Sequence, residues 1–224
     1  MTGSGSRPDS DAVATLRAAL ADHVLRHEVT VDRFERMLSV ASSRLRSLTV
    51  VLENLWDPHN VSAVIRSAEG FGIDEAHVVE QPHRFRTNRG VARGADRWLR
   101  IHRHADIGAC LEHLRSRGFR TCAADVGAGC RPLPEIPLDR PIAIVLGSEK
   151  EGLTTEAKSL AELCFTIPMH GMTASFNVSV SAAITLWDLC RRRREMLARD
   201  GDLTLDEQIA RVGAWLARQA SRRG

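Results

Sequence analysis

The sequence contains no long run of apolar residues. Although 43% of its 224 residues are hydrophobic, no stretch approaches the roughly 20 apolar residues that a membrane-spanning helix needs. Residues 1–11 are rich in Gly, Ser and Asp and lack the apolar core of a signal peptide. They therefore predict a disordered lead, and we expect a cytoplasmic protein with no membrane segment.

Closely paired cysteines are also absent. Cys110, Cys122, Cys130, Cys164 and Cys190 occur singly, and none belongs to a C-x-x-C pair. Zinc sites usually show such pairs, and an odd number of cysteines does not fit a complete disulfide framework. We therefore predict neither a metal site nor a disulfide framework, as is typical of a reducing compartment.

The common nucleotide-binding motifs are missing as well. The chain has no G-x-x-x-x-G-K-[ST] and no G-x-G-x-x-G. The first absence excludes a P-loop, and the second disfavours an oxidoreductase that uses a dinucleotide.

Lysine is scarce, and the basic character of the chain comes from clustered arginines. Only two of its 31 basic residues are lysines, and its net charge is +3. Residues 83–104 carry seven arginines against one acid, Asp96, and residues 191–194 form a second arginine run. Such clusters can bind nucleic-acid phosphates, and the alternative is a solvated surface.

Hydrophobic periodicity predicts an alternation of strands and helices. We expect strands over 48–52, 76–79, 98–102, 119–124, 141–146 and 164–167. Helices are expected over 12–27, 32–46, 60–71, 106–117, 176–196 and 204–219, the last with a capping box of Thr204 and Glu207. The Pro-rich stretch 131–141 predicts a surface loop. This alternation indicates an α/β fold with a mainly parallel sheet covered by helices on both faces.

Ligands of open α/β sheets bind beyond the carboxyl ends of the strands, where this sequence places three loops. Residues 54–60 lead into a helix that bears Arg66. Residues 147–152 (GSEKEG) have a glycine at each end, which permits close approach of a ligand to the backbone. Residues 168–177 (PMHGMTASFN) precede a long helix.

Each of these signals also has a purely structural interpretation. The glycine-bounded loop is typical of a tight turn before a helix. Asn60, Ser175 and Asn177 are typical helix N-caps, and Arg66 is typical of an exposed surface arginine. None of them is specific alone.

Together, and in this order, the three segments resemble the TrmH branch of the SPOUT RNA methyltransferases. NVSAVIRSAEGFG (60–72), VLGSEKEGL (145–153) and IPMHGMTASFNVSVSAAI (167–184) are similar to its motifs 1, 2 and 3. The resemblance extends from about residue 32 to the final helix. Within the branch it is strongest to the bacterial tRNA guanosine-18 2′-O-methyltransferases.

The resemblance implies methyl transfer from S-adenosylmethionine (SAM) to a guanosine ribose in tRNA, at position 18 of the D-loop. It implies a homodimer with the active site at the subunit interface and a C-terminal trefoil knot in a SPOUT domain over 47–199. Helical extensions over 12–46 and 200–224 would flank that domain. A 2′-O-methyltransferase of ribosomal RNA has the same motifs, and a non-enzymatic RNA-binding protein on the same fold is a further alternative.

The resemblance also implies roles for individual residues. The catalytic set would be Arg66, Asn60, Glu149, Ser175 and Asn177. Cofactor contacts would come from Ala124, Leu146, Gly147, Gly152, Ile167, Met169 and Phe176. RNA phosphates would be held by Arg191, Arg193, Arg84, Arg86 and Arg89. Because a guanidinium resists deprotonation, we expect Arg66 to stabilise the developing 2′-oxyanion and not to act as a base.

Overall fold

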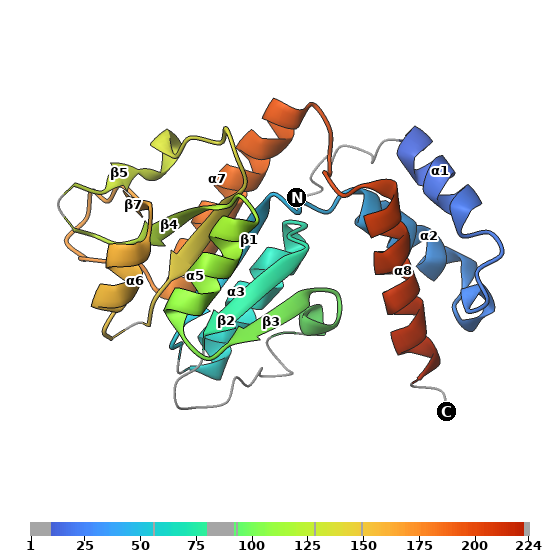
Figure 1. Ribbon diagram of the computed structural model, residues 1–224, viewed down its shortest axis with the longest axis horizontal. Coiled ribbons are helices and arrows are strands. Elements are labelled where there is room, and N and C mark those ends of the chain that lie inside the picture. The colour runs from blue at the N-terminus through green and yellow to red at the C-terminus, as the bar shows by residue number, and fades with distance from the viewer. Residues whose placement is uncertain are drawn as a thin grey trace. The chain divides into compact units, whose positions relative to one another are not determined.

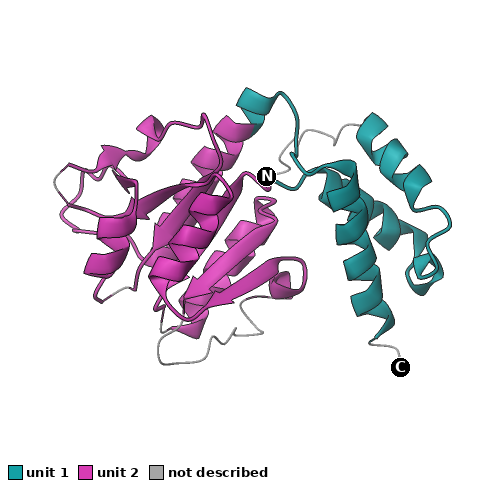
Figure 2. Ribbon diagram, viewed as in Figure 1, with its two compact units in different colours: residues 1–45, 194–224 teal, residues 46–193 magenta. Residues whose placement is uncertain are grey.

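The computed structural model describes residues 10–55, 57–79, 92, 94–127, 129–148 and 150–221. They form two compact units (Figure 2), one of residues 46–193 and one of residues 1–45 and 194–224. The predicted disordered lead lies outside the described residues except for Ser10 and Asp11, which begin a helix.

The larger unit is built on a seven-stranded sheet in which every pair of neighbouring strands is parallel (Figure 1). Its order is β3-β2-β1-β6-β4-β7-β5. The strands are β1 (Leu48–Glu53), β2 (Glu75–Val79), β3 (Arg100–His104), β4 (Arg120–Ala124), β5 (Arg131–Pro132), β6 (Ile142–Leu146) and β7 (Leu163–Thr166). Every residue of β1 and β6 is buried, which a sheet covered on both faces requires. The α/β prediction is confirmed.

Helices lie between the strands and after the last one. α3 (Pro58–Gly70), α5 (Ile107–Ser116) and α6 (Thr155–Leu160) lie between strands, with 3₁₀ turns η2 (Ala95–Arg97) and η3 (Leu133–Glu135), and α7 (Val178–Leu197) follows β7. α5 and α6 share a buried apolar cluster with side chains of β1, β2, β4 and β6. α3 connects β1 to β2, toward the β3 edge of the sheet, whereas α5 connects β3 to β4, in the opposite direction across the sheet. Because such crossovers are right-handed, the two helices lie on opposite faces of the sheet.

The smaller unit contains α1 (Ser10–Ala19), η1 (Arg26–Glu28), α2 (Val31–Ser42) and α8 (Leu205–Ala220). Arg44 is fully buried there, with its guanidinium 5.6 Å from the ring centroid of Trp215. The predicted capping box of α8 is confirmed, because Thr204 and Glu207 bond reciprocally to each other's backbone N–H groups.

Several elements differ from the sequence prediction, among them α2, which ends at Ser42 and not at residue 46. α1 ends at Ala19 and not near residue 27, and the ring of His23 accepts the N–H of Leu25 in the turn that follows. β3 begins two residues later than expected, because η2 and Trp98 precede it. The stretch 131–141 is not a simple surface loop, since it contains β5 and η3 and buries three apolar side chains, Leu133, Ile136 and Leu138. Among the described helices, none is both long and apolar enough to cross a membrane.

Candidate functional site

A pocket of about 340 Å³ lies in the larger unit, where β4, β6 and β7 end. All seven residues predicted to contact a cofactor line it, and so does Ser175 of the predicted catalytic set. These residues are Ala124, Leu146, Gly147, Gly152, Ile167, Met169 and Phe176. They lie where β4, β6 and β7 end, so the parallel sheet brings two of the three predicted loops, 147–152 and 168–177, together at this edge with the end of β4. No residue of the first predicted loop, 54–60, is among those that line the pocket.

The loop after β6 is closed by its own backbone. Ser148 and Gly152 form an antiparallel bridge, with N–O distances of 3.1 and 2.9 Å in the two directions. A Cβ on Gly147 would lie 2.2 Å from the carbonyl carbon of Gly152. Gly152 itself has a φ of +69°, which favours glycine. The turn interpretation is confirmed. Gly147 and Gly152 also line the pocket wall, so the ligand interpretation stays a prediction that this turn does not exclude.

Glu53, which sequence reasoning missed, anchors this loop to the sheet. It is buried at the end of β1. Its carboxylate accepts the Thr154 N–H at 3.0 Å and the Thr154 hydroxyl at 2.6 Å. Thr154 is also the N-cap of α6, so one buried carboxylate fixes both the end of the loop and the start of the helix. An acid directly after an apolar strand was the available signal.

Asp125 and Lys158 place a charged pair on the pocket wall, and neither was predicted. Their side chains are 2.8 Å apart. Burial raises the pKa of Asp125, but the hydrogen bonds from Lys158 and from the Val126 N–H outweigh it, so the pKa lies below its usual value. The carboxylate therefore stays ionised and can accept hydrogen bonds from a ligand. Asp125 directly follows β4, so the rule on strand ends could have found it.

Asn177 joins the third loop to α3. Its side-chain amide donates to the side-chain oxygen of Asn60 at 3.2 Å. Its own oxygen accepts the Ser179 N–H at 2.8 Å, so Asn177 also caps α7, as the structural alternative predicts. Asn60 is not an N-cap, because Asp57 occupies that position and accepts the His59 N–H.

Arg66 is exposed on α3 and is not among the residues that line the pocket. It lies six residues after Asn60, which is about 9 Å along a helix axis. The Asn60–Asn177 hydrogen bond therefore connects the helix of Arg66 to the pocket loop. Glu149, Arg84, Arg86 and Arg89 lie outside the described residues.

The arginine run in α7 is largely occupied by structural contacts. Arg192 donates to the carbonyls of Leu133 and Ile136. Arg193 is 4% exposed and donates to the carbonyls of Leu138 and Arg140 at 2.9 and 2.6 Å. This placement argues against the phosphate contact predicted for Arg193, because its buried guanidinium is hydrogen-bonded to the backbone of the Pro-rich stretch.

Arg191 is the more accessible of the two phosphate ligands predicted in this run. Its side chain is 44% exposed, contacts Asp188 at 3.3 Å and lies 5.5 Å from the ring centroid of Trp187. A half-exposed guanidinium can reach a phosphate from solvent without a change in the fold. The predicted phosphate contact is therefore kept for Arg191.

A disulfide joins Cys130 and Cys164, contrary to the expectation that no disulfide would form. Arg131 pairs with Phe165 where β5 lies beside β7. The residues before them, Cys130 and Cys164, are therefore neighbours, with their Cα atoms 4.6 Å apart. The sequence separation of 34 residues hid this proximity, because β5 was not predicted.

Comparisons with known proteins agree on one family. Residues 47–187 match the model of the SpoU rRNA Methylase family. The chain is 35% identical to a tRNA (guanosine(18)-2′-O)-methyltransferase of Escherichia coli K12 over 86% of this chain and 87% of that protein. It is 36% identical to one of Thermus thermophilus over 74% and 86%. A crystal structure of the A. aeolicus TrmH/SpoU tRNA modifying enzyme aligns with a TM-score of 0.77 at 27% identity, covering 84% of this chain and 96% of that one.

Proposed function

The chain belongs to the SpoU rRNA Methylase family, and from this membership we propose that it transfers a methyl group from SAM to a ribose 2′-hydroxyl of tRNA. One observation carries the proposal: every residue that the family resemblance assigns to the cofactor lines a single pocket at the strand ends. A pocket of this volume is within the usual range for a small-molecule ligand.

Guanosine 18 of tRNA is the proposed substrate position. Both relatives named for that activity align over more than four fifths of their own length, and the alignments of 199 and 166 residues are longer than the larger unit (46–193), so the likeness is not limited to that unit. A ribosomal RNA substrate is the alternative, since the catalytic motifs do not distinguish the two. A non-enzymatic RNA-binding role is disfavoured by the intact pocket with its glycine-lined loop.

The pocket residues suit the parts of SAM. Its sulfonium supplies an electrophilic methyl group, which a ribose oxygen can take up. The backbone of Gly147 and Gly152 permits close approach of a flat base, and Phe176 supplies apolar surface. The ionised carboxylate of Asp125 can accept hydrogen bonds from hydroxyl or ammonium groups. We assign these contacts to the donor, and Glu53 to positioning the loop that makes them.

Arg66 is proposed to act on the acceptor. A ribose hydroxyl is a weak nucleophile, and alignment behind the methyl carbon can contribute on the order of 7 kcal/mol. A permanently charged guanidinium can hold a neighbouring phosphate with two parallel hydrogen bonds and stabilise the oxyanion as it forms. The proton would leave to water or to that phosphate. Asn60, Asn177, Ser175 and Glu149 are assigned to support this geometry.

We further propose a homodimer, a trefoil knot in the SPOUT domain (47–199) and a cytoplasmic location. The dimer is supported by α7, where Val180 is 43% and Trp187 57% exposed. Val180 and Trp187 are seven residues apart, so they lie on one face of this helix, and a partner covering that face would bury both. The position of Arg66 outside its own pocket wall is consistent with a site completed by a second copy.

The test uses unmodified transcript tRNA and SAM labelled in the methyl group. Alkaline hydrolysis then maps the product, because a 2′-O-methyl blocks cleavage at one linkage. We expect one protected linkage after guanosine 18, and no label in a transcript with 2′-deoxyguanosine at that position. Labelling of ribosomal RNA alone, or transfer to the deoxy transcript, would overturn the assignment.

A further inference from the structure

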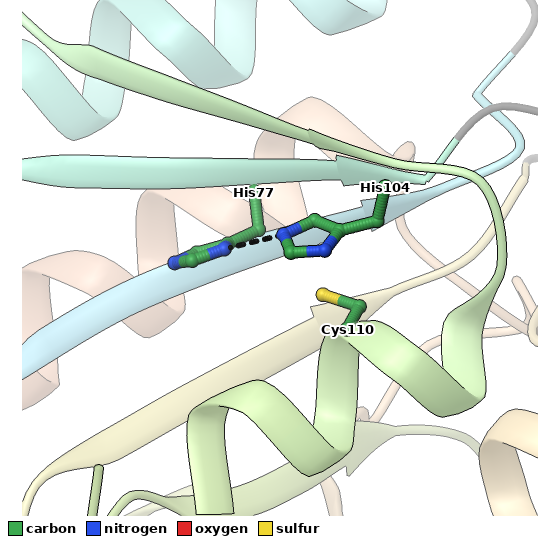
Figure 3. Close-up of side chains that lie close together, drawn as sticks. All are labelled: His77, His104 and Cys110. Carbon is green, nitrogen blue, oxygen red and sulfur yellow. Dashed lines mark hydrogen bonds between the residues drawn. The ribbon is translucent and has the colours of Figure 1, made fainter. Parts of the chain in front are cut away.

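A second cluster of chemically active side chains lies far along the sheet from the pocket. His77 comes from β2, His104 from the end of β3 and Cys110 from α5 (Figure 3). Nδ1 of His77 and Nε2 of His104 are 2.9 Å apart. One ligand atom from each of the three residues lies within 4.8 Å of the other two. Figure 3 shows the Cys110 sulfur pointing toward the two rings.

The register of the parallel sheet produces this arrangement. His77 is paired with His102 in β3, and His104, two residues further on, is on the same face as His102. α5 covers that face, with Cys110 buried among its apolar residues. His113 follows Cys110 by three residues on the same helix. Its ring centroid is 6.0 Å from that of His77 and 5.9 Å from that of His104.

Glu75 lies on the Nε2 side of the His77 ring. Its Oε1 is 3.6 Å from Nε2, which is beyond hydrogen-bond distance, and this buried nitrogen has no hydrogen-bond partner among the described residues. The nearby negative charge favours the proton on Nε2, which leaves the lone pair of Nδ1 facing His104.

Glu75 is itself an unsuitable ligand, because its charge is already compensated. Its carboxylate lies 2.6 Å from Arg117, 3.1 Å from Arg100 and 3.3 Å from His102. The remaining donors are two imidazoles and one thiol. Such a set favours zinc-like d-block ions over Mg²⁺ or Ca²⁺, which prefer oxygen ligands.

We propose that His77, His104 and Cys110 form a binding site for one Zn²⁺-class divalent ion, which His113 or a water completes to four ligands. Zn–N bonds of about 2.0–2.1 Å separate two tetrahedral nitrogens by about 3.3 Å, so the observed 2.9 Å needs only a small opening.

Binding of the ion forms a sulfur–metal bond. The Cys110 thiol, which is protonated at neutral pH in its ordinary state, releases its proton to the buffer, while the imidazoles contribute lone pairs only. One proton released per bound ion is therefore expected.

The test is titration of the full-length, metal-stripped protein with Co²⁺ under reducing conditions. Co²⁺ is coloured, takes tetrahedral sites that suit Zn²⁺, and gives a near-ultraviolet charge-transfer band when a thiolate binds it. We expect saturation at one equivalent, displacement of the colour by Zn²⁺, and release of about one proton. The Cys110→Ser variant should lose the charge-transfer band.

His104→Ala should weaken binding by about 100-fold or more, since even loss of an outer-shell partner typically costs 10- to 100-fold. Cys122→Ser is the matched control, because Cys122 is also a buried free cysteine but lies in β4, three strands from β2. His27→Ala is the histidine control. Absence of a charge-transfer band in the wild-type protein, or its survival in Cys110→Ser, would overturn the site. Methyl transfer is not needed for any readout, so the proposed function can fail without affecting this result.

Discussion

At the scale of single residues, Gly147 is the position where one added carbon has the largest expected effect on donor binding. In Gly147→Ala the new Cβ would meet the backbone of Gly152 and Leu153 at 2.2–2.3 Å, and backbone cannot move aside as a side chain can. The loop must open, and we expect SAM affinity to fall by roughly 100-fold, about 2.8 kcal/mol. Calorimetric titration with SAM measures the change.

Gly171→Ala is the control for that substitution. Gly171 lies in the third loop, but a Cβ there would meet nothing closer than the Thr173 hydroxyl at 3.9 Å. Its SAM affinity should remain near wild type. Equal losses in both variants would show that loop flexibility, and not the contact at Gly147, decides binding.

Arg66 offers a test of mechanism at the same scale. Arg66→Lys keeps the positive charge but loses the planar fork that can hold a phosphate with two hydrogen bonds. We expect kcat to fall by about 100-fold, the size typical for one lost transition-state donor, while the Kd for SAM is unchanged. Single-turnover methyl transfer measures the rate. Near-full turnover with an unchanged pH profile would refute the role proposed for the fork.

Site residues could be predicted from the sequence only where they belong to a motif of several residues. The pocket residues were identified because three motifs matched in order, and they do line one pocket. Glu53 and Asp125 belong to no such motif, and an isolated acid in a sequence has too many explanations. Their positions follow from contacts with Thr154 and Lys158, which lie 101 and 33 residues further along the chain.

At the scale of elements, α7 carries two arginines that look alike in the sequence and differ in environment. Arg193→Gln should lower the free energy of unfolding by about 3 kcal/mol, because it leaves two buried carbonyls without a charged donor. Arg191→Gln should change stability by less than about 1 kcal/mol, since the Arg191 guanidinium is half exposed and Asp188 keeps its ion pair with Arg192. Urea denaturation compares them.

The same two variants should differ in tRNA binding, with the larger effect now in Arg191→Gln. If Arg191 contacts a phosphate, Arg191→Gln weakens binding at every sequence and reduces the salt dependence of log K by about one unit. Arg193→Gln, measured below its unfolding transition, should leave the salt dependence unchanged. A reduced slope in Arg193→Gln alone would reverse this assignment of roles.

Elements were predicted well where one physical signal dominated. Short runs of apolar and β-branched residues located β1 and β6, and the capping box located the start of α8. Prediction failed where local preference and tertiary contact disagree. β5 contains Pro132, which ordinarily argues against a strand, yet pairing with β7 at the sheet edge forms it. A sequence window does not contain that partner.

At the scale of the whole molecule, strand order determines what the chain can do, and the sequence does not contain it explicitly. Placing β6 between β1 and β4 brings Glu53 beside Thr154. Placing β3 beside β2 makes the histidine cluster, and placing β5 beside β7 makes the disulfide. Each of these contacts depends on pairing between segments that no local pattern links, which is why all three escaped prediction.

The proposed dimer makes a quantitative prediction about sharing of active sites. Two inactive chains, Arg66→Ala and Gly147→Ala, can be co-expressed with different tags and the mixed dimer purified through both. If Arg66 serves the partner's pocket, one site of the mixed dimer carries both lesions and the other carries none. Such a dimer should regain about half of the wild-type activity, as two-fold symmetry requires.

If Arg66 instead serves its own pocket, each site of the mixed dimer has one lesion and activity stays near zero. Binding of one SAM per mixed dimer verifies that the Arg66→Ala chain keeps a working pocket, so a negative result cannot arise from misfolding of that chain. Because Arg66 does not line the pocket of its own chain, we expect restored activity, with the pocket of one subunit holding the donor and the arginine of the other holding the ribose.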